Sequence, residues 1–395
     1  MKKIMILGAT ATQVPLIETA KRLGLHTIVA GIEGDYPGLK VADEVCYVDI
    51  RDPQAVLEKA KALEIDGIAT CCMDLGVRAL GYVCEKMGLT GLTEKAALLS
   101  NNKLLMKEAF AAGNVKSPKF YKVSDVQDLK SAWEEIAGPV ILKAVDLQAS
   151  RGIFVCREYQ ELENAFFEIM KLTRETFCIA EEFLTGIDIG SQAFVYHGDV
   201  LFVLPHNDEV YTGSANKPIG HSAPLLADET IHQKVVEESI KAIKAIGLDN
   251  CAVNIDLLKT ADDVYMIELT GRAGATCLPE MVCEYYGIDY YEMIVKMAVG
   301  EDPRPVFESR KEPFTPNASR FVMAEKTGIL KEFKDLNTKR DDIVKFDIYV
   351  KPGDKVNKFD DGKDRLGQIV VKGKTVEQCF TRLDEITKNL YMVIE

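Results

Sequence analysis

Apolar runs and amphipathic segments alternate along the first 70 residues of the chain. Short apolar runs are typical of buried strands, whereas apolar positions three or four residues apart are typical of helices. The pattern predicts strands at residues 3–8, 27–30, 44–48 and 67–70, with helices at 13–23 and 53–63 between them. Because strands alternate with helices of ten or more residues, we expect a parallel α/β sheet of Rossmann-like architecture.

From about residue 117 the pattern changes, and strands and hairpins dominate. A cluster of prolines between 303 and 316 then marks a boundary, and the last 80 or so residues predict a small α+β module. Strands are expected at 119–123, 140–145, 153–156, 177–182, 191–196, 200–205 and 367–371, and near residues 321 and 347. A hairpin is expected at 251–269, and helices are expected at 125–136, 159–172, 228–246 and 376–389.

Composition narrows the class of protein. The chain has 395 residues and a net charge of −13, which argues against nucleic acid and anionic membranes as partners. It has no apolar run of about 18 residues and no signal-peptide pattern, so we expect a cytoplasmic protein. Its 10 cysteines include no C-x-x-C motif and read as buried, reduced thiols.

Two acids lie on the predicted hairpin. If the turn is centred on Asp262, Asp256 lies directly opposite Glu268 and Asn254 opposite Thr270, all on one face. Opposed carboxylates on apolar strands need a compensating cation, and oxygen ligands suit Mg²⁺. The alternative is a hairpin slipped by one residue, with one of the two acids facing water.

Arg272 follows four residues after Glu268, between Gly271 and Gly274, which let a ligand approach closely. A guanidinium beside a metal site can clamp phosphate or carboxylate oxygens, and a salt bridge to a surface acid is the alternative.

Lys143 interrupts an apolar strand and therefore needs a buried anion, unless it extends to water at a sheet edge. The loop Gln-Ala-Ser-Arg-Gly at residues 148–152 follows. Such a loop can wrap backbone N–H groups around phosphates, although an ordinary hairpin turn is the more common outcome.

Two further segments are candidates for nucleotide contacts. Ser100 reads as a helix N-cap, which places Lys103 in the first turn, where a bound anion would offset its conflict with the helix dipole. A solvated lysine is the alternative. The linker at residues 180–188, Ala-Glu-Glu-Phe-Leu-Thr-Gly-Ile-Asp, joins two strands and could hold adenine and ribose or be an exposed turn.

Other nucleotide and nucleophile motifs are absent. The turn from Gly8 to Gln13 keeps only the first glycine of G-x-G-x-x-G, which argues against NAD. The sequence contains neither the P-loop motif G-x-x-x-x-G-K-[ST] nor the nucleophile motif G-x-S-x-G.

Taken together, the order and spacing of these elements resemble the ATP-grasp superfamily over almost the whole chain. The resemblance implies a Rossmann-like preATP-grasp domain at residues 1–112, a two-lobed ATP-grasp domain at 113–305 and a C-terminal α+β module at 306–395. The smaller lobe would cover about 113–183 and the larger about 184–305. It also implies an ADP-forming ligase that uses ATP with Mg²⁺ or Mn²⁺, and a homodimer as in relatives.

The resemblance also assigns roles to residues of this chain. Asp256 and Glu268 would hold the metal ion, and Asp188, where the family more often has glutamate, would hold the ribose hydroxyls. Arg272 would stabilise the acyl phosphate. The remaining nucleotide contacts would be Lys103, Lys143, Ser150, Arg151, Gly152, Glu181, Glu182, Phe183 and Leu184.

One residue departs from the pattern of the family, and two segments resemble one branch of it. Thr270 occupies the position where many members have asparagine, which puts a third protein ligand or a second metal ion in doubt. The form Glu-x-x-x-Arg-x-Gly and the segment Pro-Ile-Gly-His-Ser-Ala-Pro look similar to the L-amino-acid ligase branch, near carbamoyl-phosphate-synthase relatives. His221 and Lys217 are therefore candidate substrate or phosphate contacts, although His221 reads equally as a surface histidine.

The implied reaction joins a small carboxylate, such as an amino acid, to an amine through an acyl phosphate. One alternative is a bicarbonate-activating carboxylase or carbamoyl-phosphate-type synthetase with the same nucleotide site. A second is a catalytically silent ATP-binding regulatory module, which the threonine at position 270 favours.

Overall fold

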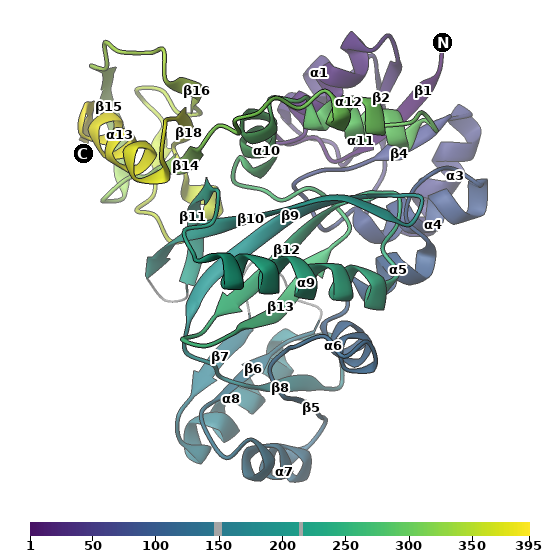
Figure 1. Ribbon diagram of the computed structural model, residues 1–395, viewed down its shortest axis with the longest axis vertical. Coiled ribbons are helices and arrows are strands. Elements are labelled where there is room, and N and C mark those ends of the chain that lie inside the picture. Colours follow the sequence, from purple (N-terminus) through teal and green to yellow (C-terminus); the bar gives the residue numbers. More distant parts are fainter. Residues whose placement is uncertain (146–151, 213–215) are drawn as a thin grey trace.

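The computed structural model describes residues 1–145, 152–212 and 216–395. Figure 1 shows the N-terminal domain and the C-terminal module on opposite sides above a large sheet, with a smaller lobe below it. The expected combination of α/β and α+β parts is confirmed. No helix in these ranges combines the length and apolar character needed to cross a bilayer.

The N-terminal alternation folds into the expected parallel sheet, with strand order β3-β2-β1-β4. The central strand β1 is apolar on both faces and buried from Ile4 to Leu7, as strands covered by helices on both sides are. The elements are β1 (Lys3–Leu7), α1 (Val14–Arg22), β2 (His26–Gly31), α2 (Pro37–Val41), β3 (Glu44–Tyr47), α3 (Pro53–Leu63), β4 (Gly67–Ala69), α4 (Val77–Met87) and α5 (Glu94–Leu99).

The turn after β1 is filled by a side chain of the chain itself. Gln13 is fully buried; its Oε1 accepts a hydrogen bond from the backbone N–H of Thr10, and its Nε2 donates to the carbonyl of Cys71. In a dinucleotide fingerprint such turn N–H groups would face the pyrophosphate. This turn is therefore built as a packed connection within the sheet.

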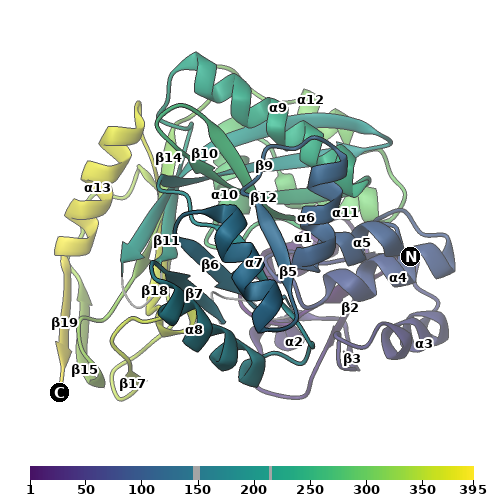
Figure 2. The ribbon, with the colours of Figure 1, turned by 90° about the horizontal axis from the view of Figure 1, so that it is seen from below.

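The smaller lobe is an antiparallel sheet of order β5-β8-β6-β7 with two helices packed on it. Figure 2 shows these helices, α7 and α8, facing the viewer from below. Asp125 caps α7, because its side chain accepts hydrogen bonds from two backbone N–H groups of the first turn. Helix α6 (Lys103–Ala112) precedes the lobe and packs against α9. The elements of the lobe are β5 (Phe120–Val123), α7 (Val126–Ile136), β6 (Val140–Lys143), β7 (Ile153–Cys156), α8 (Tyr159–Leu172) and β8 (Cys178–Glu182).

The larger sheet has eight strands in the order β13-β12-β9-β10-β11-β14-β18-β16. Helix α9 packs on one face, and α10 and α11 cover part of the other face. The elements from the larger lobe are β9 (Ile187–Tyr196), β10 (Asp199–Thr212), β11 (Asn216–Ala223), α9 (Glu229–Ile246), β12 (Cys251–Lys259), β13 (Val264–Thr270), α10 (Leu278–Tyr286), α11 (Tyr290–Ala298) and α12 (Arg304–Glu308).

The face of this sheet under α10 and α11 is aromatic at one end of its strands and polar at the other. Phe194 of β9 and Phe202 of β10 pack against Tyr290. Residues two apart share a face, so Gln192 and Gly190 continue the same face beyond Phe194. The polar end is where the functional side chains gather.

Three strands of the C-terminal module extend this same sheet, because β14 pairs with β11. The predicted boundary between residues 305 and 306 therefore separates elements that share one hydrogen-bonded sheet. The remaining elements are β14 (Asn317–Val322), β15 (Gly328–Asp335), β16 (Ile343–Ile348), β17 (Lys355–Val356), a 3₁₀ turn (Gly362–Asp364), β18 (Gly367–Lys372), α13 (Val376–Lys388) and β19 (Leu390–Ile394).

Candidate active site

The two hairpin acids lie at the polar end of the large sheet. Asp256 pairs with Glu268 and Asn254 pairs with Thr270, which confirms the predicted register. Nearer the turn the pairing is offset by one residue, and a bulge between Asp256 and Leu257 restores the predicted alignment at the acids. Both acids face the same cavity, so the slipped hairpin is ruled out.

A cavity of about 320 Å³ lies in front of these acids. It forms where the N-terminal domain, the start of α6, the smaller lobe and the large sheet meet, which is typical of ligand sites. The lining residues are Asp74, Arg78, Leu98, Ser100, Asn101, Asn102, Lys103, Met106, Val145, Ile153, Glu175, Asn254, Asp256, Glu268, Leu269, Thr270 and Arg272.

The surroundings shift the pKa values of Asp256 and Glu268 in opposite directions. The Glu268 side chain is 43% exposed, toward the cavity, and Nζ of Lys103 lies 3.5 Å from its Oε2. The Lys103 ammonium holds the pKa of Glu268 below its usual range. Burial, followed by the Glu268 carboxylate, raises the pKa of Asp256 well above its usual range. The folded chain therefore disfavours two negative charges on this pair.

This donor set fits a hard divalent cation. The pair offers carboxylate oxygens, and an added cation would offset both the burial and the mutual repulsion of the acids. Thr270 adds a hydroxyl oxygen that is buried and has no hydrogen-bond partner among the described residues. Oxygen-only ligands of this kind suit Mg²⁺ or Mn²⁺.

Lys103 reaches the cavity from the first position of α6. The predicted helix start is corrected by two residues: Asn102 is the N-cap, with its side chain accepting a hydrogen bond from the backbone N–H of Leu105 at 3.1 Å. Ser100 instead follows the preceding helix, α5, as its C-cap. The serine was misassigned because both residue types cap helices well and only two positions separate them.

Lys143 has the buried anion that its position demands. Its Nζ lies 2.9 Å from Oε2 of Glu181, which is 1% exposed, and Nζ of Lys107 lies 3.2 Å from the same oxygen. Burial alone would raise the pKa of Glu181, but the two lysines outweigh it and lower the pKa to about 2. Burial lowers the pKa of Lys107. Oε1 of Glu181 is buried without a hydrogen-bond partner in the described ranges.

The predicted linker between the lobes is partly strand. Glu181 and Glu182 end β8, and Asp188 lies in β9 opposite Leu258. The backbone N–H of Phe183 donates to the carbonyl of Pro139 at 2.9 Å, which ties the linker to the smaller lobe.

The predicted phosphate loop falls largely outside the described residues, since these exclude Ser150 and Arg151. Gly152 is described and has a φ of +67°, a left-handed conformation that favours glycine.

Arg272 lines the cavity and is held there by an acid from the N-terminal domain. Its Nη2 and Nε lie 2.6 and 2.8 Å from Oδ1 of Asp74. The predicted alternative was a salt bridge to a surface acid; Arg272 does form a salt bridge, and its partner Asp74 lines the same cavity. Asp74 follows the carboxyl end of β4, where ligands bind in parallel sheets. That placement was the only signal for it in the sequence.

The two β11 candidates point elsewhere. Lys217 donates to the backbone carbonyl of Asp360 in the C-terminal module and lies 3.4 Å from its carboxylate. His221 is buried, and its Nδ1 lies 2.7 Å from Oδ1 of Asp208 on β10. Neither belongs to the residues that line the cavity.

Two sequence-family models match the chain. The model described as phosphoribosylglycinamide synthetase, ATP-grasp (A) domain, matches residues 101–275. The model described as L-amino acid ligase C-terminal domain 2 matches residues 320–395.

Known proteins resemble the chain over different lengths. The structure of phosphoribosylglycinamide synthetase from Anaerococcus prevotii is 43% identical, covers 100% of both chains and has a TM-score of 0.89. An L-amino acid ligase from Bacillus licheniformis shares the fold at 20% identity, covering 100% of this chain and 99% of that one, with a TM-score of 0.85. Alanine–anticapsin ligase from Bacillus subtilis is 27% identical over 61% of this chain, which spans only 56% of that relative.

Proposed function

Since this chain belongs to the ATP-grasp ligases, we propose that it is an ADP-forming carboxylate–amine ligase acting through an acyl phosphate. The observation that carries this proposal is the convergence of Asp256, Glu268, Lys103 and Arg272 on one cavity. Acids that suit a divalent cation and cations that suit phosphate oxygens are the groups that phosphoryl transfer needs.

The nucleotide would lie between the lobes. Oε1 of Glu181 is a buried acceptor without a partner among the described residues, so it suits an amino group such as that of adenine. Lys143 and Lys103 would contact the phosphates, and Asp188 the ribose. Mg²⁺ held by Asp256 and Glu268 would neutralise charge on the phosphate chain.

The first step forms the activated carboxylate. An oxygen of the substrate carboxylate attacks the γ-phosphorus, the bond from that phosphorus to the bridging oxygen breaks, and ADP leaves. Arg272, held by Asp74, would bind the carboxylate and then the acyl phosphate oxygens. In the second step an amine nitrogen attacks the carbonyl carbon, and phosphate leaves with the oxygen that came from the carboxylate.

The substrate class follows from the relatives. The C-terminal match to an L-amino acid ligase domain favours an amino acid or similar small carboxylate. A second candidate is the reaction for which the 43% identical relative is named, the synthesis of phosphoribosylglycinamide. Glycine would then be the carboxylate and a phosphoribosylamine the amine. We place the reaction in the cytoplasm, as the composition suggests.

A bicarbonate-activating enzyme and a silent ATP-binding module would behave differently from this ligase. The bicarbonate-activating enzyme would use the same nucleotide contacts but would need no amino acid. The silent module would bind ATP without turnover. Thr270 was its only support. The Thr270 hydroxyl beside the acids has no hydrogen-bond partner in the part of the chain that the structure describes, and it supplies an oxygen where the family more often has an amide.

A trapping screen tests the proposal. Purified protein with MgATP and hydroxylamine is offered each of the twenty standard amino acids, and ADP and acyl hydroxamate are measured together. The proposal predicts equal amounts of both products for at least one amino acid. ADP release that needs only bicarbonate, or ATP binding without ADP release for any carboxylate, would reject it. A further assay, with glycine and a phosphoribosylamine in place of hydroxylamine, distinguishes the second candidate from an amino-acid ligase.

A further inference from the structure

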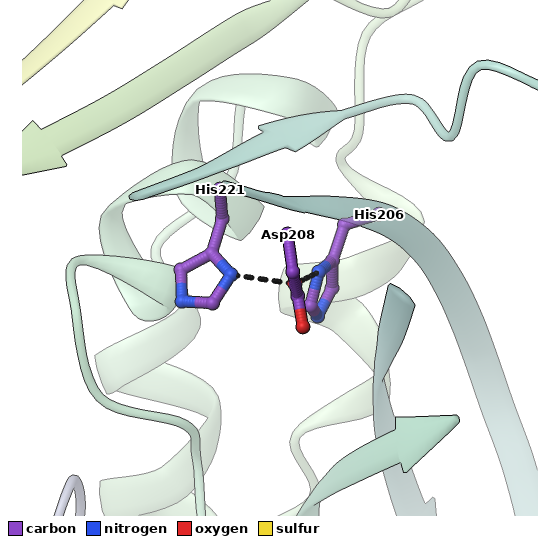
Figure 3. A group of neighbouring side chains, drawn as sticks. All are labelled: His206, Asp208 and His221. Atoms are coloured by element: carbon purple, nitrogen blue, oxygen red, sulfur yellow. Dashed lines mark hydrogen bonds and ion pairs between the residues drawn. The ribbon is translucent and has the colours of Figure 1, made fainter. Parts of the chain in front are cut away.

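Three polar side chains outside the cavity lining form a buried cluster on the same face of the sheet. His206 and Asp208 lie on β10, and His221 lies opposite Asp208 on β11 (Figure 3). Nδ1 of His221 and Nδ1 of His206 lie 2.7 and 2.9 Å from the same Asp208 oxygen, Oδ1. His206 is 2% exposed and His221 is 5% exposed.

The cluster continues the row of metal-site acids across the sheet. Glu268 pairs with Asp256, Asp256 with Gly190, and Gly190 with His206. Two strand spacings of about 4.8 Å therefore separate the backbones of Asp256 and His206. The cluster lies beside the predicted site of phosphoryl transfer, on the side of the C-terminal module.

Gly190 allows the His206 ring to lean across β9. A Cβ atom at Gly190 would lie 2.3 Å from Cε1 and 2.7 Å from Nε2 of His206, so any larger residue would displace the ring from this position. The ring therefore covers the backbone of position 190 and directs Nε2 over β9. That Nε2 is buried and has no hydrogen-bond partner among the described residues. A buried nitrogen of this kind needs a donor from a ligand or a water molecule.

The hydrogen-bond pattern fixes what the cluster can bind. Nδ1 of His221 is hydrogen-bonded to Asp208, whereas Nδ1 of His206 lies close to the same oxygen without hydrogen-bond geometry. An ionised carboxylate only accepts, so a ring proton on each Nδ1 that faces Asp208 leaves Nε2 of the neutral ring as an acceptor. The two histidines hold the pKa of Asp208 below its usual range although burial opposes this, and burial lowers the pKa of His206. With both rings neutral, the cluster carries the Asp208 charge and presents the two Nε2 atoms as acceptors.

These properties select a cationic donor. Phosphate and carboxylate oxygens would meet only acceptors and like charge. A transition metal bound through the two Nε2 atoms would have only two imidazole ligands, fewer than the three or four protein ligands of zinc sites, and binding through Nδ1 would cost the protons that face Asp208. The ammonium group of an amine substrate brings positive charge and N–H donors without either cost.

The reaction under Proposed function needs such a group, and this inference rests on it. An ammonium has no lone pair and must lose a proton before attacking the acyl phosphate. The lysines and Arg272 of the site are cations. Among its acids, Asp256 and Glu268 are assigned to the metal ion, whereas Glu181 and Asp74 are paired with cations. Glu175, the remaining acid of the lining, is exposed on the smaller lobe.

We propose that the His206–Asp208–His221 cluster binds the amine substrate as its ammonium ion and removes one proton. An N–H bond of the ammonium breaks, the proton bonds to Nε2 of His206, and the nitrogen keeps the electron pair that attacks the carbonyl carbon. Asp208 stabilises the resulting imidazolium through its Nδ1–H, and His221 holds Asp208 in place.

One variant, assayed separately for acyl phosphate formation and for attack by the amine, tests this proposal. Hydroxylamine is largely unprotonated near neutral pH and needs no base, whereas amino acids react only after losing a proton. Asp208→Asn is expected to keep hydroxamate formation within about twofold of wild type. Amide formation with the amino-acid panel should fall roughly 10²–10⁴-fold, the usual contribution of a general base. Asp199→Asn, exposed at the start of the same strand, is the matched control and should change neither rate.

The outcomes separate this inference from the function it rests on. No hydroxamate from the wild-type enzyme rejects the function. Normal wild-type hydroxamate with equal loss, or no loss, of both products in Asp208→Asn rejects the cluster alone. Zinc that co-purifies with the wild type and is absent from the variant also rejects it. His206→Asn should show the same split between products if Asp208→Asn does not fold.

Discussion

Asp256 and Glu268 face each other across β12 and β13, yet their surroundings push their pKa values in opposite directions. Glu268 is stabilised as a carboxylate by Lys103, whereas burial and Glu268 itself disfavour the charge on Asp256. The pair is therefore arranged to gain most from a divalent cation, and this relationship leads to the first prediction.

Removing the disfavoured charge should stabilise the metal-free protein while ending activity. Asp256→Asn is expected to raise the free energy of unfolding without Mg²⁺, because a folded-state pKa above the usual range marks a destabilised carboxylate. The same variant should release ADP at least about 100-fold more slowly, since it loses a metal ligand. Urea unfolding and a coupled ADP assay measure the two effects.

The exposed hairpin turn supplies a control for that variant. Asp262→Asn makes the same chemical change in the same hairpin, away from the cavity, and should alter neither quantity. A metal-free Asp256→Asn protein that is less stable than wild type would contradict the account of the acid pair.

Lys103 should contribute to nucleotide affinity. Lys103→Met removes a cation that lines the cavity, and charge-assisted hydrogen bonds contribute about 1.5–3 kcal/mol, so MgATP should bind roughly 10–100-fold more weakly. Calorimetric titration with a non-hydrolysable ATP analogue measures this. Lys95→Met, exposed on the preceding helix α5, is the control. Unchanged affinity in Lys103→Met would remove this lysine from the nucleotide site.

Arg272 should act on the carboxylate more than on the nucleotide. Arg272→Lys keeps the charge but loses the planar fork that Asp74 orients. We expect carboxylate-dependent ADP release to fall about 10–100-fold with MgATP affinity preserved, and Asp74→Asn to reproduce part of the loss. Initial rates over a range of amino-acid concentrations measure it. A loss confined to MgATP binding would reassign the arginine to the nucleotide.

The Lys107–Glu181–Lys143 group predicts an acid dependence of stability. The pKa of Glu181 falls from 4.5 to about 2, so the folded state binds its proton less readily than the unfolded state. The resulting stability, about 3 kcal/mol, is complete above pH 4.5 and is lost as the pH falls toward 2. The stability difference between wild type and Glu181→Gln, measured by urea unfolding, should therefore shrink as the pH drops below about 5. A difference that grows on acidification would contradict the assignment.

The short-range sequence pattern correctly predicted features that depend on residues within one hairpin or one strand. Alternation along the hairpin placed Asp256 opposite Glu268, and one lysine in an apolar strand, Lys143, correctly implied a buried anion. Two strands, by contrast, went unpredicted: β15 mixes polar and apolar positions with intermediate burial, and β19 is a short apolar run that directly follows α13.

What the sequence missed depends on contacts between distant segments. The strand containing His206 and Asp208 was predicted to end at Pro205, because proline usually terminates strands, yet β10 continues to Thr212. Asp74 and Lys107 reach their partners, Arg272 and Glu181, across 198 and 74 positions of the chain. No periodicity within one element reports such pairings.

Oxygen transfer tests the central claim most directly. A carboxylate substrate labelled with ¹⁸O in both oxygens is incubated with MgATP, the amine and the enzyme, and the released phosphate is analysed by mass spectrometry. An acyl phosphate intermediate predicts one ¹⁸O atom in each phosphate formed, with ADP as the nucleotide product. Unlabelled phosphate, or label in AMP, would contradict it.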